Sequence, residues 1–361
     1  MKRIIVSVTN DLVTDQRVSK TCSTLSEMGY DILLIGRRLK KSLPIQRSYS
    51  TKRFRLLFNK GVLFYAEYNF RLFLFLLFSK KNILFSNDLD TLLPNYLISK
   101  LLHKELFFDS HELFSEIPEL SNRPRVKKIW LGLEKRIIPK LKHVITVSDS
   151  IKQHYQSHYG ITATVIRNLP ITQKTQTTSF GQSMVDKKII LYQGAINIGR
   201  GLELMIETMS LLDEYLLYII GEGDILQDLK EHTSTSALEN KVIFINKKTP
   251  KELRTLTPNA SVGISLEEDL GLNYRYALPN KVFDYIHANV PVIVSNLPEM
   301  KAIIENYNVG EVLIKRTPEE LASLIKKVSE KTYTSQLNLA KTELNWDVEK
   351  KQLIQVFKTI N

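Results

Sequence analysis

The chain has 361 residues, of which 43% are hydrophobic and 24% are charged. This composition is typical of a folded globular protein and excludes a disordered, collagen-like or disulfide-rich chain. The single cysteine, Cys22, excludes a disulfide within the chain, and the apolar run 4–8 is too short for the core of a secretory signal. We therefore expect a cytoplasmic protein with room for two domains.

The net charge of +12 is concentrated in one half of the chain. Residues 1–170 contain 28 Lys and Arg against 14 Asp and Glu, whereas the remaining residues contain 22 against 24. A strongly basic half indicates an anionic partner, which leaves a membrane surface, a lipid pyrophosphate and nucleic acid as alternatives. The sequence contains no recognisable RNA or DNA motif that would favour the third of these.

The first elements predict a parallel sheet. Residues 2–10 and 31–37 are apolar runs typical of buried strands, and a helical stretch that ends at Gly29 connects them. This succession indicates a βαβ unit of a doubly wound domain. The loop after the first strand lacks the G-x-G-x-x-G of a dinucleotide fold, which argues against a nicotinamide or flavin site. Asp15 and Arg17 in this loop either line a site or serve as a helix cap and a solvated arginine.

The next stretch combines a basic loop with an apolar helix. Residues 37–60 are basic and have no apolar period, so we expect a loop there. Residues 61–81 predict a helix, and its apolar run 72–78 is far shorter than a membrane span. The helix is either an ordinary core helix of the first domain or an amphipathic helix whose basic flanks rest on anionic lipid.

Two further strands end on polar residues. The strand 82–88 leads into a D-x-D sequence at 88–90, a weak metal-binding signal that we discount because other features bind a diphosphate without metal. Residues 105–120 run from a strand into a loop with His111 and Glu112. Because α/β folds place chemistry at the carboxyl ends of strands, His111 is a candidate site residue. The alternative is a histidine with a purely structural role.

A second domain begins after a polar stretch. Residues 171–186 contain Gly, Ser and Thr without an apolar period, which is typical of a linker. The strand 187–194 then ends on Gly194, where the missing side chain lets a ligand approach the backbone. Arg200 stands directly before the following helix, where a cation and free N–H groups favour an anion.

The most informative stretch is 276–300. Pro279 has a fixed φ that suits a first helical turn, and the expected helix 280–288 places Lys281 and Asp284 on one face. A helix start that carries a lysine attracts anions through its N–H groups, its dipole and the added charge. Asp284, one turn deeper, is placed to accept hydrogen bonds from ribose hydroxyls. The alternative is a solvated Lys–Asp pair on an exposed helix.

The segment P-N-K-x-F-D-Y-x-x-A-x-x-P-V-I-x-S (279–295) resembles the donor-nucleotide helix of family 4 glycosyltransferases with the GT-B fold. The motifs Y-x-G-x-x-x-x-x-R-G-L (192–202) and D-S-H-E-x-x-x-E (109–116) resemble the same family. The resemblance implies an α/β architecture of two Rossmann-like, doubly wound domains that face a central cleft, with a C-terminal helix crossing back to the first domain. The expected parts are an N-terminal acceptor-binding domain at 1–170, a linker at 171–186, a C-terminal donor-binding domain at 187–345 and the returning helix at 346–361.

The resemblance also implies a function. We expect a retaining glycosyltransferase that moves a sugar from a nucleoside diphosphate to an acceptor hydroxyl, without a metal or another cofactor. The expected acceptor is a lipid-linked or cell-surface glycan intermediate of polysaccharide biosynthesis, reached by the enzyme from the cytoplasm as a peripheral membrane protein. Nucleic acid is not an expected partner under this interpretation.

The site residues follow from the matched motifs. His111, Arg200 and Lys281 are the expected catalytic residues, with His111 beside the donor sugar and the two cations on the donor diphosphate. The expected donor-binding residues are Gly194, Arg200, Glu222, Leu278, Asn280, Lys281 and Asp284. The expected acceptor-side residues are Asp15, Arg17, His111 and Glu112.

Two positions depart from the family pattern. Ala195 stands where a second arginine is common, and Tyr276 stands where the first of two glutamates is usual. The departures keep three alternatives open: a GT-B-fold epimerase acting on a nucleotide sugar, a non-catalytic protein that binds anions or nucleic acid, and an inactive regulatory homologue.

Overall fold

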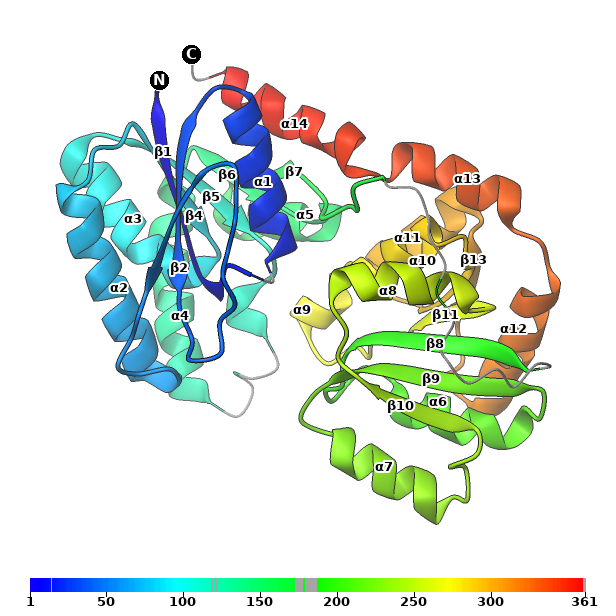
Figure 1. Ribbon diagram of the computed structural model, residues 1–361. Coiled ribbons are helices and arrows are strands. Elements are labelled where there is room, and N and C mark those ends of the chain that lie inside the picture. The colour runs from blue at the N-terminus through cyan, green and yellow to red at the C-terminus, as the bar shows by residue number, and fades with distance from the viewer. Residues whose placement is uncertain (14, 118–119, 121–122, 173–177, 179–186, 360–361) are drawn as a thin grey trace. The chain divides into compact units, whose positions relative to one another are not determined.

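The computed structural model describes residues 1–13, 15–117, 120, 123–172, 178 and 187–359. The chain divides into two compact units (Figure 1): unit 1 comprises 1–168 and 349–361, and unit 2 comprises 169–348. Most of the expected linker, 171–186, lies outside the described residues, as do the last two residues of the expected returning helix.

Unit 1 contains a parallel sheet of seven strands within the described residues, in the order β3-β2-β1-β4-β5-β6-β7. The strands are β1 (Arg3–Asp11), β2 (Asp31–Arg37), β3 (Ser50–Phe54), β4 (Ile83–Asn87), β5 (Glu105–Ser110), β6 (His143–Thr146) and β7 (Thr164–Val165). The α-helices are α1 (Gln16–Glu27), α2 (Gly61–Phe78), α3 (Leu89–Leu102), α4 (Pro124–Ile137), α5 (Asp149–Tyr159) and α14 (Trp346–Lys358), which begins in unit 2.

The central strands of this sheet are buried because helices cover both faces. Figure 1 shows α2 and α3 on one side of the sheet and α1 on the other. The strand β4 is buried along its whole length, which suits its apolar sequence. The helix α14 completes the core: the ring of Phe357 stacks on those of Phe85 and Phe107 and meets the ring of Tyr30 edge-on. The C-terminal residues are therefore part of the hydrophobic core of unit 1.

Unit 2 repeats the topology with a parallel sheet in the order β10-β9-β8-β11-β12-β13. The strands are β8 (Lys188–Ala195), β9 (Tyr215–Glu222), β10 (Val242–Asn246), β11 (Val262–Ser265), β12 (Val292–Ser295) and β13 (Gly310–Leu313). The α-helices are α6 (Leu202–Thr208), α7 (Leu226–Thr235), α8 (Pro250–Leu256), α9 (Leu272–Arg275), α10 (Asn280–His287), α11 (Pro298–Tyr307), α12 (Pro318–Glu330) and α13 (Thr334–Glu343). Pro279 is the N-cap of α10, one residue before the helix begins.

One expectation about the fold is wrong. The stretch 37–60 was expected to be a loop, yet it contains β3, which pairs with β2 at the edge of the first sheet. Its sequence, STKRF, buries only Phe54, so the alternation that usually reveals a strand is weak. The pairing of its backbone with β2 makes it a strand although its side chains do not predict one.

Candidate active site

Charged residues, several of them expected site residues, gather in each unit where the strand order reverses. In unit 1 the loops after β4 and β5 carry Asp88 and His111, and Arg17 lies in the first turn of α1, which follows β1. In unit 2 the loops after β8 and β11 carry Arg200 and Glu267. Open parallel sheets bind their ligands at this position, beyond the carboxyl ends of the strands. Each unit therefore presents one candidate cluster, described separately below.

The cluster in unit 2 brings Arg200 and Lys281 to the same oxygen atom. The Lys281 Nζ lies 2.9 Å from Glu267 Oε1, and the Arg200 Nη1 lies 3.4 Å from that atom. The two cations come from positions 81 residues apart in the sequence, as their numbering shows. Because both contact one carboxylate oxygen, they are close enough to contact a common anion.

Aromatic rings support both cations. The Lys281 Nζ lies 4.1 Å from the ring centre of Tyr192, and the Arg200 guanidinium lies 4.8 Å from that of Tyr274. The loop before α6 is held close by Gly201, which has φ +69° and leaves no room for a side chain: a Cβ there would lie 2.5 Å from the carbonyl oxygen of Leu266. These contacts fix the position of each charge before any ligand binds.

Glu267 is the functional residue that the sequence interpretation missed. Its side chain is fully buried, and it also accepts a hydrogen bond of 2.7 Å from the Ser265 hydroxyl. Burial opposes ionisation, but the charge of Lys281, the hydrogen bonds and the charge of Arg200 outweigh it and lower the pKa of Glu267. The signal was the acidic run 267–269 directly after a buried strand. The cluster of three charged side chains retains one surplus positive charge.

The cluster in unit 1 surrounds His111 with carboxylates. Its Nδ1 lies 3.1 Å from Asp88 Oδ2 and its Nε2 lies 3.3 Å from Asp109 Oδ2, while its backbone N–H donates to Asp88 Oδ1 at 2.8 Å. Burial favours the neutral ring, but the charges of Asp88 and Asp109 outweigh it and raise the pKa of His111 well above its usual value. Both ring nitrogens face carboxylates, which favours the imidazolium, a hydrogen-bond donor at both nitrogens.

Arg17 supports this cluster from behind. Its Nε and Nη2 donate to the two carboxylate oxygens of Asp109 at 2.9 and 2.6 Å, and its Nη1 donates to the Ile166 carbonyl at 2.7 Å. Burial opposes ionisation of Asp109, yet the charges of Arg17 and His111 hold the pKa of that carboxyl well below its usual range. Arg17 is thus a buried, bidentate partner and not a solvated arginine. Asp15 caps α1 by accepting a hydrogen bond from the Val18 N–H at 3.0 Å.

Backbone strain at Asp88 and a raised pKa at Asp90 complete the description of the unit 1 cluster. Asp88 has φ +56°, a conformation that costs a non-glycine residue about 1–3 kcal/mol and that recurs at functional sites. Burial and the neighbouring charge of Asp88 raise the pKa of Asp90 to about 8. Asp90 accepts a hydrogen bond from the Thr9 hydroxyl. Within the described ranges, no group of three or more His, Cys, Asp or Glu is placed to hold a metal ion.

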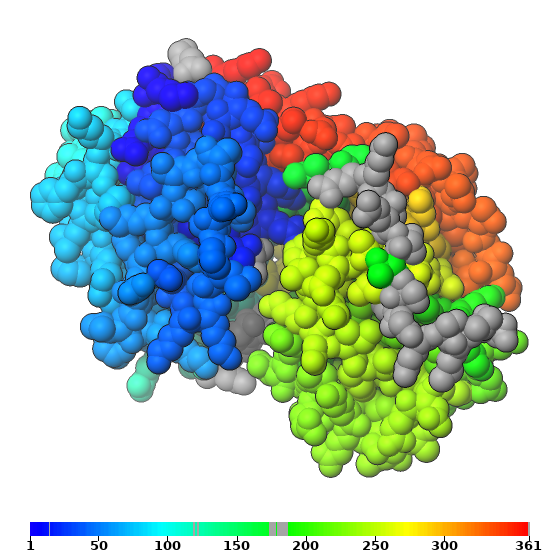
Figure 2. Space-filling view, in the orientation of Figure 1, coloured from blue at the N-terminus to red at the C-terminus, as the bar shows by residue number. Residues whose placement is uncertain are grey.

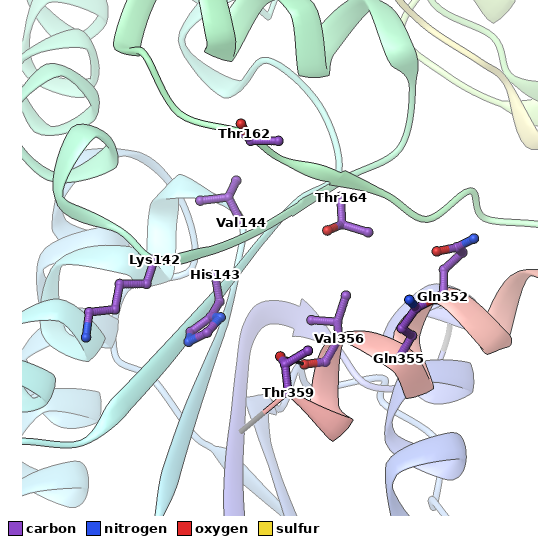
Figure 3. Close-up of a pocket in the computed structure, with 9 residues that line it drawn as sticks. All are labelled: Lys142, His143, Val144, Thr162, Thr164, Gln352, Gln355, Val356 and Thr359. Atoms are coloured by element: carbon purple, nitrogen blue, oxygen red, sulfur yellow. Dashed lines mark hydrogen bonds between the residues drawn. The ribbon is translucent and has the colours of Figure 1, made fainter. Parts of the chain in front are cut away.

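A pocket of about 320 Å³ lies elsewhere in unit 1 (Figure 3). It is lined by Lys142, His143, Val144, Thr162, Thr164, Gln352, Gln355, Val356 and Thr359. These residues belong to β6 and its flanks, to the β7 segment and to α14. The pocket opens near the beginning of β6, where His143 contacts Glu105, and none of the expected site residues lines it. It lies between α14 and the β6–β7 edge of the sheet, and no residue of either charged cluster lines it.

Two family models match the chain. The model described as Glycosyltransferase Family 4 matches residues 16–170, and the model described as Glycosyl transferases group 1 matches residues 175–345. Together they account for nearly all of both units. The chain is a family 4-like glycosyltransferase with the GT-B fold. No curated protein matches it in sequence.

Solved structures show the same fold at low sequence identity. The chain is similar to sucrose-phosphate synthase from Thermosynechococcus elongatus, with a TM-score of 0.82, 14% identity and coverage of 100% of this chain and 99% of that one. It is similar to Anabaena HepE in complex with UDP and glucose, with a TM-score of 0.77, 12% identity and coverage of 99% and 100%. It is also similar to the lipopolysaccharide outer core galactosyltransferase WaaB, with a TM-score of 0.69, 13% identity and full coverage of both chains.

The remaining residues expected on the donor side lie in unit 2. Gly194 has φ +145°, and a Cβ there would lie 3.5 Å from Lys281 Cε. Asp284 lies on α10 with its Oδ2 3.4 Å from Gln193 Nε2. Glu222 ends β9 with an exposed side chain, and its carbonyl accepts the Ile196 N–H at 2.9 Å.

The three other expected residues are Leu278, Asn280 and Glu112. Leu278 packs against the hydrophobic core of unit 2, and Asn280 is the exposed first residue of α10. In unit 1, Glu112 is partly buried beside His111, and its backbone carbonyl accepts the Ser110 hydroxyl at 2.8 Å. Each of these residues thus lies in the same unit as the cluster that it was expected to join.

The helix α2 of the glycosyltransferase meets the length and composition of a membrane span, the one such helix among the described residues. Core helices of soluble proteins pass the same test, so this observation is weak evidence for a span. The sequence interpretation had counted only the run 72–78, whereas the helix extends from Gly61 to Phe78.

Proposed function

We propose that this glycosyltransferase transfers a sugar from a nucleoside-diphosphate donor to an acceptor hydroxyl, with retention of the anomeric configuration. The observation that carries the proposal is the contact of Arg200 and Lys281 with one oxygen of Glu267. Anabaena HepE, which has the same fold, is described in complexes with UDP and with UDP-glucose. These complexes support a nucleotide sugar as the donor.

The chemical demand of the reaction is departure of the diphosphate from an oxocarbenium-like sugar. Fixed cations that stabilise the developing negative charge are an efficient way to meet it. Lys281 is almost fully buried, so its charge acts at a lower effective dielectric than in water. The first turn of α10 adds N–H groups and the positive end of its dipole. These groups replace a metal ion in our scheme, which therefore uses no cofactor.

We assign Glu267 to holding the two cations together before the donor binds. A carboxylate between Arg200 and Lys281 reduces their mutual repulsion. The surplus positive charge is then available to the diphosphate, which competes for the same donors. Asp284, on the next turn of α10, accepts hydrogen bonds from the ribose, and Glu222 lies towards the base in this scheme.

We assign His111 to positioning the donor sugar. A histidine held as an imidazolium by Asp88 and Asp109 has no free lone pair, so it cannot abstract a proton from the acceptor. The departing diphosphate takes that proton instead, and no side-chain base is required. Asp109 and Arg17 are positioning residues, because they act on the sugar only through His111.

We further propose a lipid-linked or cell-surface glycan intermediate as the acceptor. The basic charge of residues 1–170 suits an anionic acceptor or the cytoplasmic surface of a membrane. WaaB, described as a lipopolysaccharide outer core galactosyltransferase, has the same fold. The enzyme would then act in the cytoplasm, as a peripheral protein of the membrane, in polysaccharide biosynthesis.

A thermal-shift screen of nucleotide sugars tests the donor class. A ligand at 100 times its Kd stabilises the folded state by about 2.7 kcal/mol, a readily measured shift. We expect one nucleoside diphosphate, and the nucleotide sugar that contains it, to raise the melting temperature of the protein. The corresponding nucleoside alone should not raise it. Incubating the selected donor with and without acceptor then separates transfer from epimerisation. A product that forms from donor alone, with a changed sugar configuration, contradicts glycosyl transfer.

A further inference from the structure

The helix α2 has two apolar faces, and only one of them is used by the fold. Phe64, Tyr68, Leu72 and Leu76 recur every four residues and are buried. A second stripe with the same period, Val62, Ala66, Phe70, Leu74 and Phe78, is exposed. Residues two positions apart on a helix point about 200° away from each other, so the two stripes lie on opposite sides.

The buried stripe fixes α2 in unit 1. The Tyr68 hydroxyl donates to the Val8 carbonyl at 2.6 Å, and the Tyr68 ring packs edge-on against that of Phe54. The Tyr65 ring meets that of Trp130 on α4 at 5.2 Å. These contacts tie the helix to the sheet and to its neighbour. A span across a bilayer would break them, whereas contact of the outer stripe with a surface would not.

The exposed stripe is too apolar to be an ordinary surface. Phe70 is 64% exposed and Phe78 is 83% exposed, and Leu63 beside them is also exposed. The neighbouring helix α3, which packs against α2, adds exposed Leu97 and Leu101. In Figure 2, light-blue atoms, which the colour bar assigns to this region of the chain, form part of the visible surface of unit 1. Exposed apolar side chains that recur along one face of a helix, as these do on α2, are typical of a binding surface.

The segment of the chain that contains the stripe is basic. Between residues 50 and 104 the chain has nine Lys and Arg against three acidic residues. Two of the three acidic residues, Asp88 and Asp90, belong to the unit 1 cluster. The third, Glu67, accepts hydrogen bonds from the Leu57 and Phe58 N–H groups and forms an ion pair with Arg71. Lys60 and Lys80 flank the two ends of the helix and are exposed. Long basic side chains at the rim of an apolar surface reach lipid phosphates while the apolar side chains enter the acyl region.

We propose that the outer stripe of α2 is the membrane-docking surface of this enzyme and that its partner is an anionic phospholipid bilayer. The helix lies flat, with Phe70, Leu74 and Phe78 in the lipid and Lys60 and Lys80 at the headgroups. A second copy of the chain is the less suitable occupant. A two-fold interface through this stripe would bring the basic rims of both copies together, which is repulsive. The inference deepens the membrane contact in the proposed function and names its surface.

Co-sedimentation with phospholipid vesicles tests the docking surface. The probes are vesicles of phosphatidylcholine alone and vesicles with about 30 mol % phosphatidylglycerol, at low and high salt. We expect the protein to partition at least tenfold more strongly onto the anionic vesicles at low salt. The double variant Phe70→Ser/Phe78→Ser should lose at least tenfold of that partition, because both side chains are exposed and replaceable without opening the core. The matched control Ile314→Ser/Leu339→Ser removes two exposed apolar side chains of unit 2 and should bind as the native protein does.

The outcomes separate this proposal from the proposed function. Equal binding of the Phe70/Phe78 variant and the native protein overturns the docking surface, as does equal partition onto neutral and anionic vesicles. Sedimentation velocity that shows a native dimer and a monomeric variant assigns the stripe to self-association and also overturns it. A thermal melt confirms that the variant is folded. Donor binding is measured on the native protein and on the same variant. If neither protein binds the donor while the native protein still binds vesicles, the donor assignment is rejected and the docking surface is not.

Discussion

The charged clusters of the two units differ in the balance of their charges. In unit 1, the cations Arg17 and His111 are matched by the carboxylates of Asp109 and Asp88. In unit 2, two cations share the single carboxylate of Glu267. Both clusters lie at the carboxyl edge of a sheet with the same strand order. The fold therefore supplies the location, and the side chains decide what each location can bind.

The difference indicates a division of tasks. A balanced, buried cluster has little net attraction for an anion, but it holds the imidazolium of His111 in one orientation. We expect the unbalanced cluster, in which Arg200 is partly accessible, to attract a diphosphate. Substitutions that change the balance of one cluster should therefore affect stability in unit 1 and donor binding in unit 2.

The largest effect is expected for Arg17→Met. The substitution leaves the Asp109 carboxylate buried without its bidentate partner, which costs about 3–5 kcal/mol for pairs of this kind. Chemical denaturation should show this loss, and the double variant Arg17→Met/Asp109→Asn should recover much of it because the stranded charge is gone. A loss below about 1 kcal/mol would show that the pair does not stabilise unit 1.

Lys281→Met is the corresponding change in unit 2. It removes one of the two cations proposed to bind the diphosphate. We therefore expect kcat/KM for transfer to fall at least tenfold, which corresponds to about 1.4 kcal/mol of lost transition-state stabilisation. It also leaves Glu267 with Arg200 as its one remaining cationic partner among the described residues, which lowers stability.

The double variant Lys281→Met/Glu267→Gln separates these two effects. The neutral glutamine removes the buried charge, so stability should return while transfer stays low. Recovery of both stability and transfer would mean that Lys281 serves the fold and not the donor. Denaturation and steady-state kinetics on the three proteins measure the two quantities independently.

A smaller, pH-dependent effect is expected for Asp90→Asn. An unfolded aspartate has a pKa near 4, whereas the pKa of Asp90 in the fold is about 8. Between these pH values the folded state binds a proton that the unfolded state has lost. The contribution of Asp90 to the free energy of unfolding is therefore fully present below about pH 4 and is lost as the pH rises towards about 8. Relative to the native protein, Asp90→Asn should gain stability as the pH rises from 5 to 8, by about 1 kcal/mol or more between pH 5 and pH 9.

Melting temperatures measured from pH 5 to pH 9 test this expectation. A gain of about 1 kcal/mol corresponds to about 2–4 °C for a unit of this size. The exposed Asp224→Asn serves as the control and should leave the pH profile unchanged. A native profile that does not decline relative to Asp90→Asn would show that Asp90 is already ionised at low pH.

Much of the fold could be predicted because local signals agree with it. The run 31–37 is β2 to the residue, and Pro279 marks the start of α10. The edge strand β3 could not be predicted, since four of its five side chains are not buried. Its identity depends on pairing with β2, which is a tertiary property.

Motif and charge singled out Arg200 and Lys281, which the fold brings together, but the sequence could not predict the partners that burial decides. Glu267 belongs to an acidic run that is typical of a surface, and only the fold brings Arg200 and Lys281 to it. Arg17 and Asp109 are 92 residues apart, so the sequence gives no sign that they form a pair. Side-chain partners across a sheet depend on topology, which single residues do not encode locally.

Titration calorimetry of the nucleoside diphosphate selected by the thermal-shift screen tests the central claim most directly. The proteins are the native chain, Arg200→Ala, and the control Lys327→Ala, which removes an exposed lysine of unit 2 paired with Glu311. We predict that Arg200→Ala raises the Kd of the diphosphate at least tenfold, which is about 1.4 kcal/mol of binding free energy. The affinity for the matching nucleoside should not change. Lys327→Ala should bind the diphosphate as the native protein does. Equal affinity of Arg200→Ala and the native chain for the diphosphate would contradict the account.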